Sequence, residues 1–213
     1  MKYLINSVFI FFMVITAGIA SAAEKPAKAA AASGPTPHQV VEDVTAKLMN
    51  AVKTGKDVLQ TNPNKFYSDV ESVLEEAVNF EFIARNVMGQ YWKKATPEQQ
   101  AEFVSAFKKS MVETYAKGMA NFADLKIEVE PPKEEIPDSG KVNVIQKVSS
   151  ADKVNRIAYT MARSRDPEAK WQLINVILDG VNLGLTFRSQ FAQAVNAQKG
   201  DVAAAIKGWS TSG

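Results

Sequence analysis

The side chains that most often perform catalysis or hold metal ions are scarce in this sequence. It contains one histidine, His38, and no cysteine. A histidine that acts as a general base or as a metal ligand needs partners, and the sequence supplies none for His38. A transition-metal site needs a cluster of histidine or cysteine ligands. The sequence therefore predicts neither catalysis at His38 nor a bound metal ion, and it gives no sign of a cofactor.

Carboxylates offer two further possibilities. The pairs Glu75–Glu76 and Glu134–Glu135 lack the spacing of a cation-binding loop, so we interpret them as solvated surface. Asp179 follows an apolar run, where a desolvated carboxyl group can serve as an acid. It can equally cap the turn at Gly180, and this is the simpler interpretation. We find no glycine-rich phosphate loop and no nucleophile elbow in the sequence.

The first residues have the pattern of an exported protein. Lys2, an apolar run and then the small residues 20–23 form the three parts of a secretory signal peptide, which we place at residues 1–23. Residues 24–37 contain no large apolar side chain, so we expect a flexible tether there. Residues 38–210 have the length of a single domain. Removing the signal peptide lowers the formal net charge from +2 to +1, too small a charge to indicate a nucleic-acid partner.

Four helices are predicted in the first half of the domain. Capping boxes with proline at the first helical position begin at Thr36 and at Thr96. The first of these helices is expected to stop before Gly55, the second to begin at Asn62, and a short third helix to end at Gly89. The fourth helix carries large apolar side chains at a spacing of four residues: Phe103, Phe107, Met111, Tyr115 and Met119.

The second half has the two-residue period of β-strands. Apolar residues alternate along 125–129, 142–148 and 154–162. The segment Trp171–Leu178 is apolar in both alternating sets, so we expect a central strand covered on both faces. Short connections favour antiparallel neighbours, and two helices follow, at 186–198 and 201–209. We therefore predict an α+β fold, a four-stranded antiparallel meander wrapped by about six helices.

The apolar side chains exceed what one sheet–helix interface needs. The simplest interpretation is that the large apolar side chains of the fourth helix pack on the sheet as core. Against this stand the second apolar face of the central strand and the crossover Val181–Leu183, which supply additional lining. An apolar cavity between a curved sheet and its covering helices would account for the excess.

Two segments resemble a known family. The first runs from Met88-Gly89-Gln90-Tyr91-Trp92 through Thr96-Pro97-Glu98-Gln99 to Thr114-Tyr115-Ala116. The second runs from Trp171 through Gly180-Val181 to Arg188-Ser189-Gln190-Phe191. In order and spacing both resemble the MlaC family of periplasmic phospholipid-binding proteins, also known as toluene-tolerance proteins. The resemblance spans nearly the whole mature domain, with mild departures at Asn175, Asn182 and Phe187.

The resemblance implies a lipid carrier and not an enzyme. Members of this family move phospholipid through the periplasm between an outer-membrane lipoprotein–porin complex and an inner-membrane ABC transporter with an MCE subunit, which maintains outer-membrane lipid asymmetry. They hold the acyl chains inside and leave the head group outside. For this chain the resemblance implies a periplasmic monomer whose cargo is phospholipid, with no cofactor and no nucleic-acid partner.

We expect the acyl chains to contact apolar side chains of the helices, the sheet and the crossover. This expected lining consists of Val87, Tyr91, Phe107, Met111, Tyr115, Val144, Tyr159, Met161, Val176, Val181 and Leu183. Val181 is the sharpest case, because it follows Gly180, where the backbone should turn and open the apolar surface. Arg188 and Lys93 can meet a phosphate group, although solvated surface charge is the simpler interpretation of both.

Two other classes of function remain open at this point. A small-molecule enzyme, such as an isomerase acting on an apolar substrate, would need a buried acid, and Asp179 is the candidate. An apolar-ligand binding protein on a cone-shaped α+β scaffold is an alternative of the same kind. A non-catalytic adaptor or chaperone would use an exposed apolar groove in place of an enclosed cavity.

Overall fold

The computed structural model describes residues 34–119, 125–150, 153–166 and 168–209, apart from the side chains of 56 and 117–119. The chain divides into two units after Ala32, and the described residues belong to the second. The predicted signal peptide, residues 1–23, and most of the predicted tether lie outside the described residues. Among the described helices, none is both long and apolar enough to cross a membrane.

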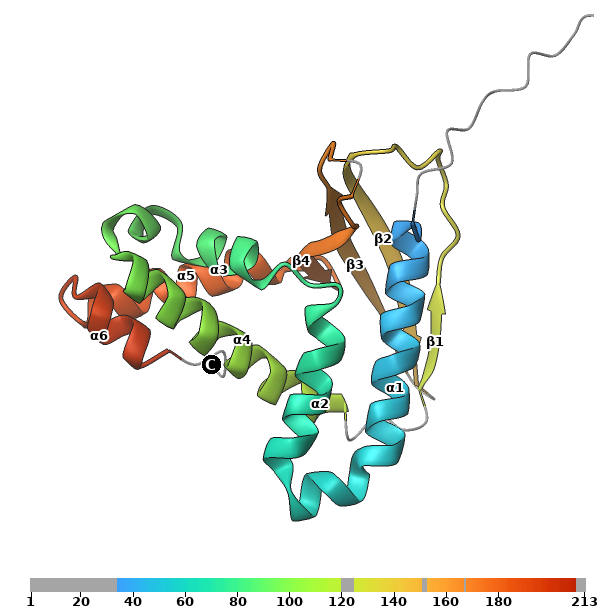
Figure 1. The fold of residues 1–213 in the computed structure, drawn as a ribbon, viewed down its shortest axis with the longest axis horizontal. Helices are drawn as coiled ribbons and strands as arrows, with labels where there is room; N and C mark the ends of the chain where they lie inside the picture. Colours follow the sequence, from blue (N-terminus) through green and yellow to red (C-terminus); the bar gives the residue numbers. More distant parts are fainter. Residues whose placement is uncertain (1–33, 120–124, 151–152, 167, 210–213) are drawn as a thin grey trace, which may run out of the picture. The chain divides into compact units, whose positions relative to one another are not determined.

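Among the described residues, four α-helices and a short 3-10 helix precede the sheet, and two α-helices follow it (Figure 1). They are α1 (Pro37–Thr61), α2 (Pro63–Glu75), α3 (Phe80–Met88), η1 (Gly89–Lys94), α4 (Pro97–Met119), α5 (Leu183–Ala197) and α6 (Val202–Lys207). Both predicted capping boxes are confirmed. The backbone N–H of Gln39 donates to Thr36 Oγ1 at 3.2 Å, and that of Gln99 donates to Thr96 Oγ1 at 3.3 Å. Each glutamine side chain accepts from the threonine N–H in return.

The prediction that the first helix stops before Gly55 is wrong, because α1 continues to Thr61. The glycine has a packing role and does not end the helix. A Cβ atom placed at Gly55 would lie 2.6 Å from the ring of Phe66, which is buried on α2. Gly55 therefore lets the two antiparallel helices approach closely, at the cost of a weak helix former inside α1.

The sheet contains five strands in the order β1-β2-β3-β4-β5, and every neighbouring pair is antiparallel. The strands are β1 (Lys126–Val129), β2 (Gly140–Ser149), β3 (Val154–Arg163), β4 (Gln172–Leu178) and β5 (Val181–Asn182). The predicted α+β fold with an antiparallel meander is confirmed, and β5 is added to the four expected strands.

The fifth strand arises from a two-residue hairpin that the sequence signals. Leu178 pairs with Val181, and the intervening Asp179 and Gly180 have φ angles of 47° and 86°. Asp-Gly with two positive φ angles is the preferred sequence of a type I′ turn. Val181 is therefore a strand residue. Leu183, expected in a crossover, is instead the first residue of α5, which is capped by Asn182.

The prediction that the side chains of the central strand alternate strictly between the two faces of the sheet is also wrong. Thr160 pairs with Asn175, but Met161 pairs with Leu173, so the register of β3 and β4 shifts by one residue at this point. Such a bulge moves Leu173 onto the face that carries Val176, although the two positions differ by an odd number of residues.

The described core consists of three apolar clusters. Phe103, Phe107 and Phe191 centre the first, among α3, α4, α5 and α6. Phe66 centres the second, among α1, α2 and the C-terminal half of α4. The third joins α1 to the sheet, where Val41 packs with Val144, Met161 and Trp171. Figure 1 shows α1, in blue, running along the sheet at β1 and β2.

Candidate functional site

One face of the sheet carries an apolar row across all five strands. In the register of the sheet, Val129 pairs with Gln146, Gln146 with Ile157, Ile157 with Leu178, and Leu178 with Val181. Directly opposed residues of neighbouring strands share a face, so these five side chains project to the same side. Gln146 is the polar exception in an otherwise aliphatic row.

Helix α1 covers this face over β2 and β3. Val41 of α1 packs in one cluster with Val144 and Met161, which lie on the same face as Gln146. The Gln146 side-chain nitrogen also donates to Thr45 Oγ1 of α1 at 2.8 Å. The polar exception is therefore satisfied by a hydrogen bond to the covering helix.

The cover ends toward β4 and β5, and the exposed fraction of the side chains in the row rises. It is 3% for Gln146, 38% for Leu178 and 54% for Val181. We call the half-buried to exposed part of this surface the open face, formed by Ile157, Tyr159, Val176, Leu178 and Val181. An apolar sheet surface that continues past its covering helix is an incomplete core and a place for an apolar ligand.

Two tyrosines stand at the inner end of the open face. The Tyr159 hydroxyl donates to Gln146 Oε1 at 2.9 Å, and burial raises the pKa of this phenol strongly. Tyr115, from α4, is 40% exposed as a residue, yet burial raises the pKa of its hydroxyl. The negative charge of an ionised Tyr115 would further raise the pKa of Tyr159.

Seven of the side chains predicted to line an acyl pocket fall into two clusters. Val87 and Phe107 are buried in the helical cluster, where Tyr91 and Met111 pack against them. Val144 and Met161 are buried in the cluster beneath α1, with Tyr159 against them. The remaining predicted lining residues are exposed (Tyr115 and Val181) or half-buried (Val176 and Leu183). The structure thus brings Tyr159, Val176 and Val181 together on one surface and places the helical residues in separate packing. Ile157 and Leu178 of the open face were not predicted, although their places in the alternation of β3 and β4 could have indicated them.

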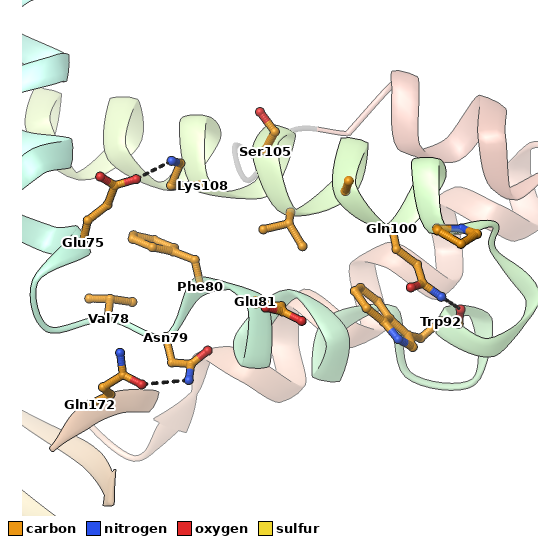
Figure 2. A pocket seen from close by; sticks show the side chains of 13 residues that line it. Glu75, Val78, Asn79, Phe80, Glu81, Trp92, Gln100, Ser105, Lys108 and Gln172 are labelled. Atoms are coloured by element: carbon orange, nitrogen blue, oxygen red, sulfur yellow. Dashed lines mark hydrogen bonds and ion pairs between the residues drawn. The ribbon is translucent and has the colours of Figure 1, made fainter. Parts of the chain in front are cut away.

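A separate hollow lies between α3 and α4 (Figure 2). Its volume is about 790 Å³, and its walls include Phe80, Trp92 and Val104. Several of its polar groups have partners: the Asn79 side chain donates to Gln172 at 2.9 Å, and the Gln100 side chain donates to the Trp92 carbonyl at 2.8 Å. Lys108 is ion-paired with Glu71 at 2.6 Å and with Glu75, and these carboxylates raise the pKa of the lysine. This hollow contains none of the side chains predicted to meet lipid.

A catalytic role for Asp179 finds no support in its surroundings. Its carboxylate accepts a hydrogen bond of 2.7 Å from the backbone N–H of Arg156 and lies 3.9 Å from the Lys153 ammonium. Its own N–H donates to the Arg156 carbonyl at 2.8 Å. Asp179 is exposed in the turn, as the simpler interpretation implied, but its carboxylate bonds the backbone of β3 and not that of the turn at Gly180.

The remaining polar candidates from the sequence are His38, Lys93 and Arg188. His38 is buried, and burial lowers its pKa although Glu42 opposes this. Within the described residues, no group of histidine, cysteine, aspartate or glutamate has the arrangement of a metal site. Lys93 and Arg188 are exposed, and the Arg188 guanidinium group lies against Gly89.

The family is decided by comparison with known sequences. The family model described as "MlaC protein" matches residues 42–211. The chain belongs to the MlaC family. A relative in Pseudomonas putida, named toluene tolerance protein ttg2D, is 33% identical over 177 residues, which cover 82% of this chain and 80% of the relative. The Haemophilus influenzae relative named intermembrane phospholipid transport system binding protein MlaC is 24% identical over 149 residues, covering 70% and 69% of the two chains.

A solved structure supports the fold of this MlaC-family chain. It is a phospholipid-binding protein from Ralstonia solanacearum, determined in complex with a phospholipid. The TM-score is 0.71 at 22% sequence identity, and the match covers 81% of this chain and 94% of the other. At this identity the likeness establishes the shared α+β architecture.

Proposed function

We propose that this protein is a periplasmic phospholipid carrier. Its open face would hold the acyl chains and leave the head group toward solvent. Support comes from family membership, from relatives whose names include phospholipid transport, and from the solved phospholipid complex of the same fold. The single observation that carries the proposal in this chain is the apolar row that is covered by α1 at Gln146 and uncovered at Val181.

The remaining predicted residues fit around this surface as a second layer. Tyr115 and Met111 of α4 and Leu183 of α5 would meet the chains beside the open face. The buried side chains Val87, Phe107, Val144 and Met161, and the half-buried Tyr91, would be reached only when a lipid separates the helical cluster from the cluster beneath α1. Phe107 and Met111 lie on α4, so a displacement of this helix would open the helical cluster.

A carrier of this kind is needed because free lipid is strongly disfavoured in water. Exposing about 30 methylene groups costs on the order of 24 kcal/mol, at about 0.8 kcal/mol for each. A protein surface of aliphatic side chains replaces the bilayer as the environment of the chains. Because the two environments are similar in polarity, transfer between them is close to neutral, and the partners must supply the direction.

We also propose the compartment and the partners. The signal-peptide pattern of residues 1–23 would place the mature chain in the periplasm. There it would exchange lipid with an outer-membrane lipoprotein–porin complex and with an inner-membrane ABC transporter that has an MCE subunit. These partners follow from the family resemblance.

The direct test is mass spectrometry of organic extracts from protein purified without detergent. A stoichiometric phospholipid in the extract is the expected result. Protein that yields no lipid, and that takes up none from phospholipid vesicles, would favour an adaptor that uses the open face to bind another protein.

A further inference from the structure

The part of the apolar row that is not covered by α1 has a definite length. It begins at Val181 of β5 and reaches Gln146 of β2, with Leu178 and Ile157 between them. Neighbouring strands lie about 4.8 Å apart, so these three steps across the sheet span about 14 Å. The hydrocarbon core of a bilayer is about 30 Å thick, which gives about 15 Å to the chains of one leaflet. One acyl chain of ordinary length therefore fits along the row.

The two ends of this part of the row differ in exposure. Val181 is 54% exposed and Leu178 is 38% exposed, whereas Gln146 is 3% exposed beneath α1. A chain that enters from solvent at Val181 would therefore lie across the strands, with its tip toward the covered end. The neighbouring row begins at Val176 of β4 and is fully buried at Val144 of β2. It spans only two steps, so it offers a shorter path.

Polar groups close the inner end of the row. The Tyr159 hydroxyl donates to Gln146 Oε1 at 2.9 Å, and Gln146 Nε2 donates to Thr45 Oγ1 of α1 at 2.8 Å. Tyr159 reaches Gln146 from the diagonal position on β3. A chain that passed this point would have to break these hydrogen bonds and leave buried polar groups without partners. The network is therefore a barrier to hydrocarbon.

We propose that Gln146 and Tyr159 set the maximum length of the acyl chain that the open face accepts. The proposal rests on the carrier function proposed above. A chain no longer than the row lies wholly on apolar side chains, so its exchange between bilayer and protein is insensitive to length. Each further methylene group has to remain in water, and at the ordinary hydrophobic cost this lowers uptake about fourfold.

The test is an exchange assay between the protein, as purified, and fluid vesicles of phosphatidylglycerol. The lipids carry monounsaturated chains of about 14 to about 24 carbon atoms, lengths that bracket the half-thickness of an ordinary bilayer. Bound lipid is measured by mass spectrometry after the vesicles are removed. We expect uptake to be nearly constant for the shorter chains. Beyond a break it should fall at least about fourfold for each added methylene group.

Gln146→Ala combined with Tyr159→Phe removes the polar groups from the barrier and leaves room for about two or three methylene groups. The break should move to longer chains by about that number. If the double variant does not fold, Tyr159→Phe alone should move the break in the same direction by about one methylene group. Thr160→Val is the matched control, because its hydroxyl donates to Asn143 on the other face of the sheet. Its break should stay at the parental length.

Uptake without any break would overturn the proposal and leave the carrier function standing. So would a break at the parental length in the Gln146 and Tyr159 variants. An equal movement of the break in Thr160→Val would also overturn it, because the effect would then come from a general loss of stability. Parent protein that takes up no lipid of any length would remove the carrier function itself, and this proposal with it.

Discussion

The hydroxyl group of Tyr159 donates a hydrogen bond of 2.9 Å to the side-chain oxygen of Gln146, whose nitrogen in turn donates to Thr45. This chain of hydrogen bonds links the sheet to α1 at the boundary between its covered and open parts. It fixes the Tyr159 ring as the inner wall of the open face.

Tyr159→Phe removes the donor and leaves the buried Gln146 oxygen without a partner. We expect a loss of about 1–2 kcal/mol in the free energy of unfolding, measured by urea denaturation. Thr160→Val is the matched control, since its hydroxyl bonds Asn143 at 3.0 Å on the exposed side of the sheet. The control should lose about 0.5 kcal/mol or less. Equal losses in the two variants would show that burial of Gln146 is unimportant.

Val181→Glu places a carboxylate on the open face, where it would have to be desolvated among acyl chains. Because Val181 is 54% exposed, we expect the folded state to tolerate the change within about 1 kcal/mol. Lipid in organic extracts, measured by mass spectrometry, should fall at least about tenfold.

Val154→Glu is the control for this variant. Val154 is 61% exposed and precedes Asn155, which shares a face with Val148, so Val154 points to the opposite side from the open face. It should retain lipid at the parental level. If the two glutamate variants retained lipid equally, the open face would not be where the chains bind.

Asp179→Ala removes the acceptor for the Arg156 N–H and places alanine at a φ of 47°. We expect a loss of about 1–3 kcal/mol in the free energy of unfolding. Asp179→Asn keeps an acceptor oxygen and tolerates this backbone conformation, so it should lose less than about 1 kcal/mol. Both variants should still carry lipid if they fold. A loss of lipid in the folded Asn variant would indicate that the charge itself acts in function.

Gly55→Ala tests the close contact of α1 and α2. The added methyl group would meet the Phe66 ring at 2.6 Å, and the cost of overpacking should be about 1–3 kcal/mol despite the better helix propensity of alanine. In Gly208→Ala the nearest atom would lie 3.5 Å away, an ordinary contact. Thermal denaturation should show a lower Tm for the first variant alone. An unchanged Tm for Gly55→Ala would mean that Phe66 can move aside freely.

His38 predicts a pH dependence of stability. Burial lowers its pKa in the folded state below the ordinary value of 6.5. The unfolded chain therefore binds a proton first as the pH falls. The contribution of His38 to stability is fully present above pH 6.5 and is lost as the pH falls toward the lowered folded pKa. His38→Gln should flatten the pH profile of the unfolding free energy in this window, measured by urea denaturation at several pH values. An identical profile in the variant would assign the dependence to other groups.

Local signals in the sequence were sufficient for most of the elements. The capping boxes at Thr36 and Thr96 are complete within four residues, so they could be identified without the tertiary structure. The strand alternation in 126–129, 140–149 and 154–163 likewise reports a sheet that is buried mainly on one face. Asp179-Gly180 is also a local hairpin signal, but the interpretation of Gly180 as a break before a crossover is wrong.

The errors arose where a residue's role depends on a distant partner. Gly55 looks like a helix terminator until Phe66, eleven positions later in the chain, is seen to occupy the space of its absent Cβ. The bulge beside Thr160 depends on how β3 and β4 align, which alternation within one strand cannot reveal.

By itself the sequence determined the α+β order of the elements and the family, because both depend on local patterns along the chain, and it predicted an export signal at residues 1–23. Only the tertiary structure decided which apolar side chains are core and which remain uncovered. Val144 and Val181 are indistinguishable as residue types, yet one is fully buried beneath α1 and the other is 54% exposed. The reason is physical: burial depends on where the covering helix ends on the sheet, and that position is set by packing between segments far apart in the chain.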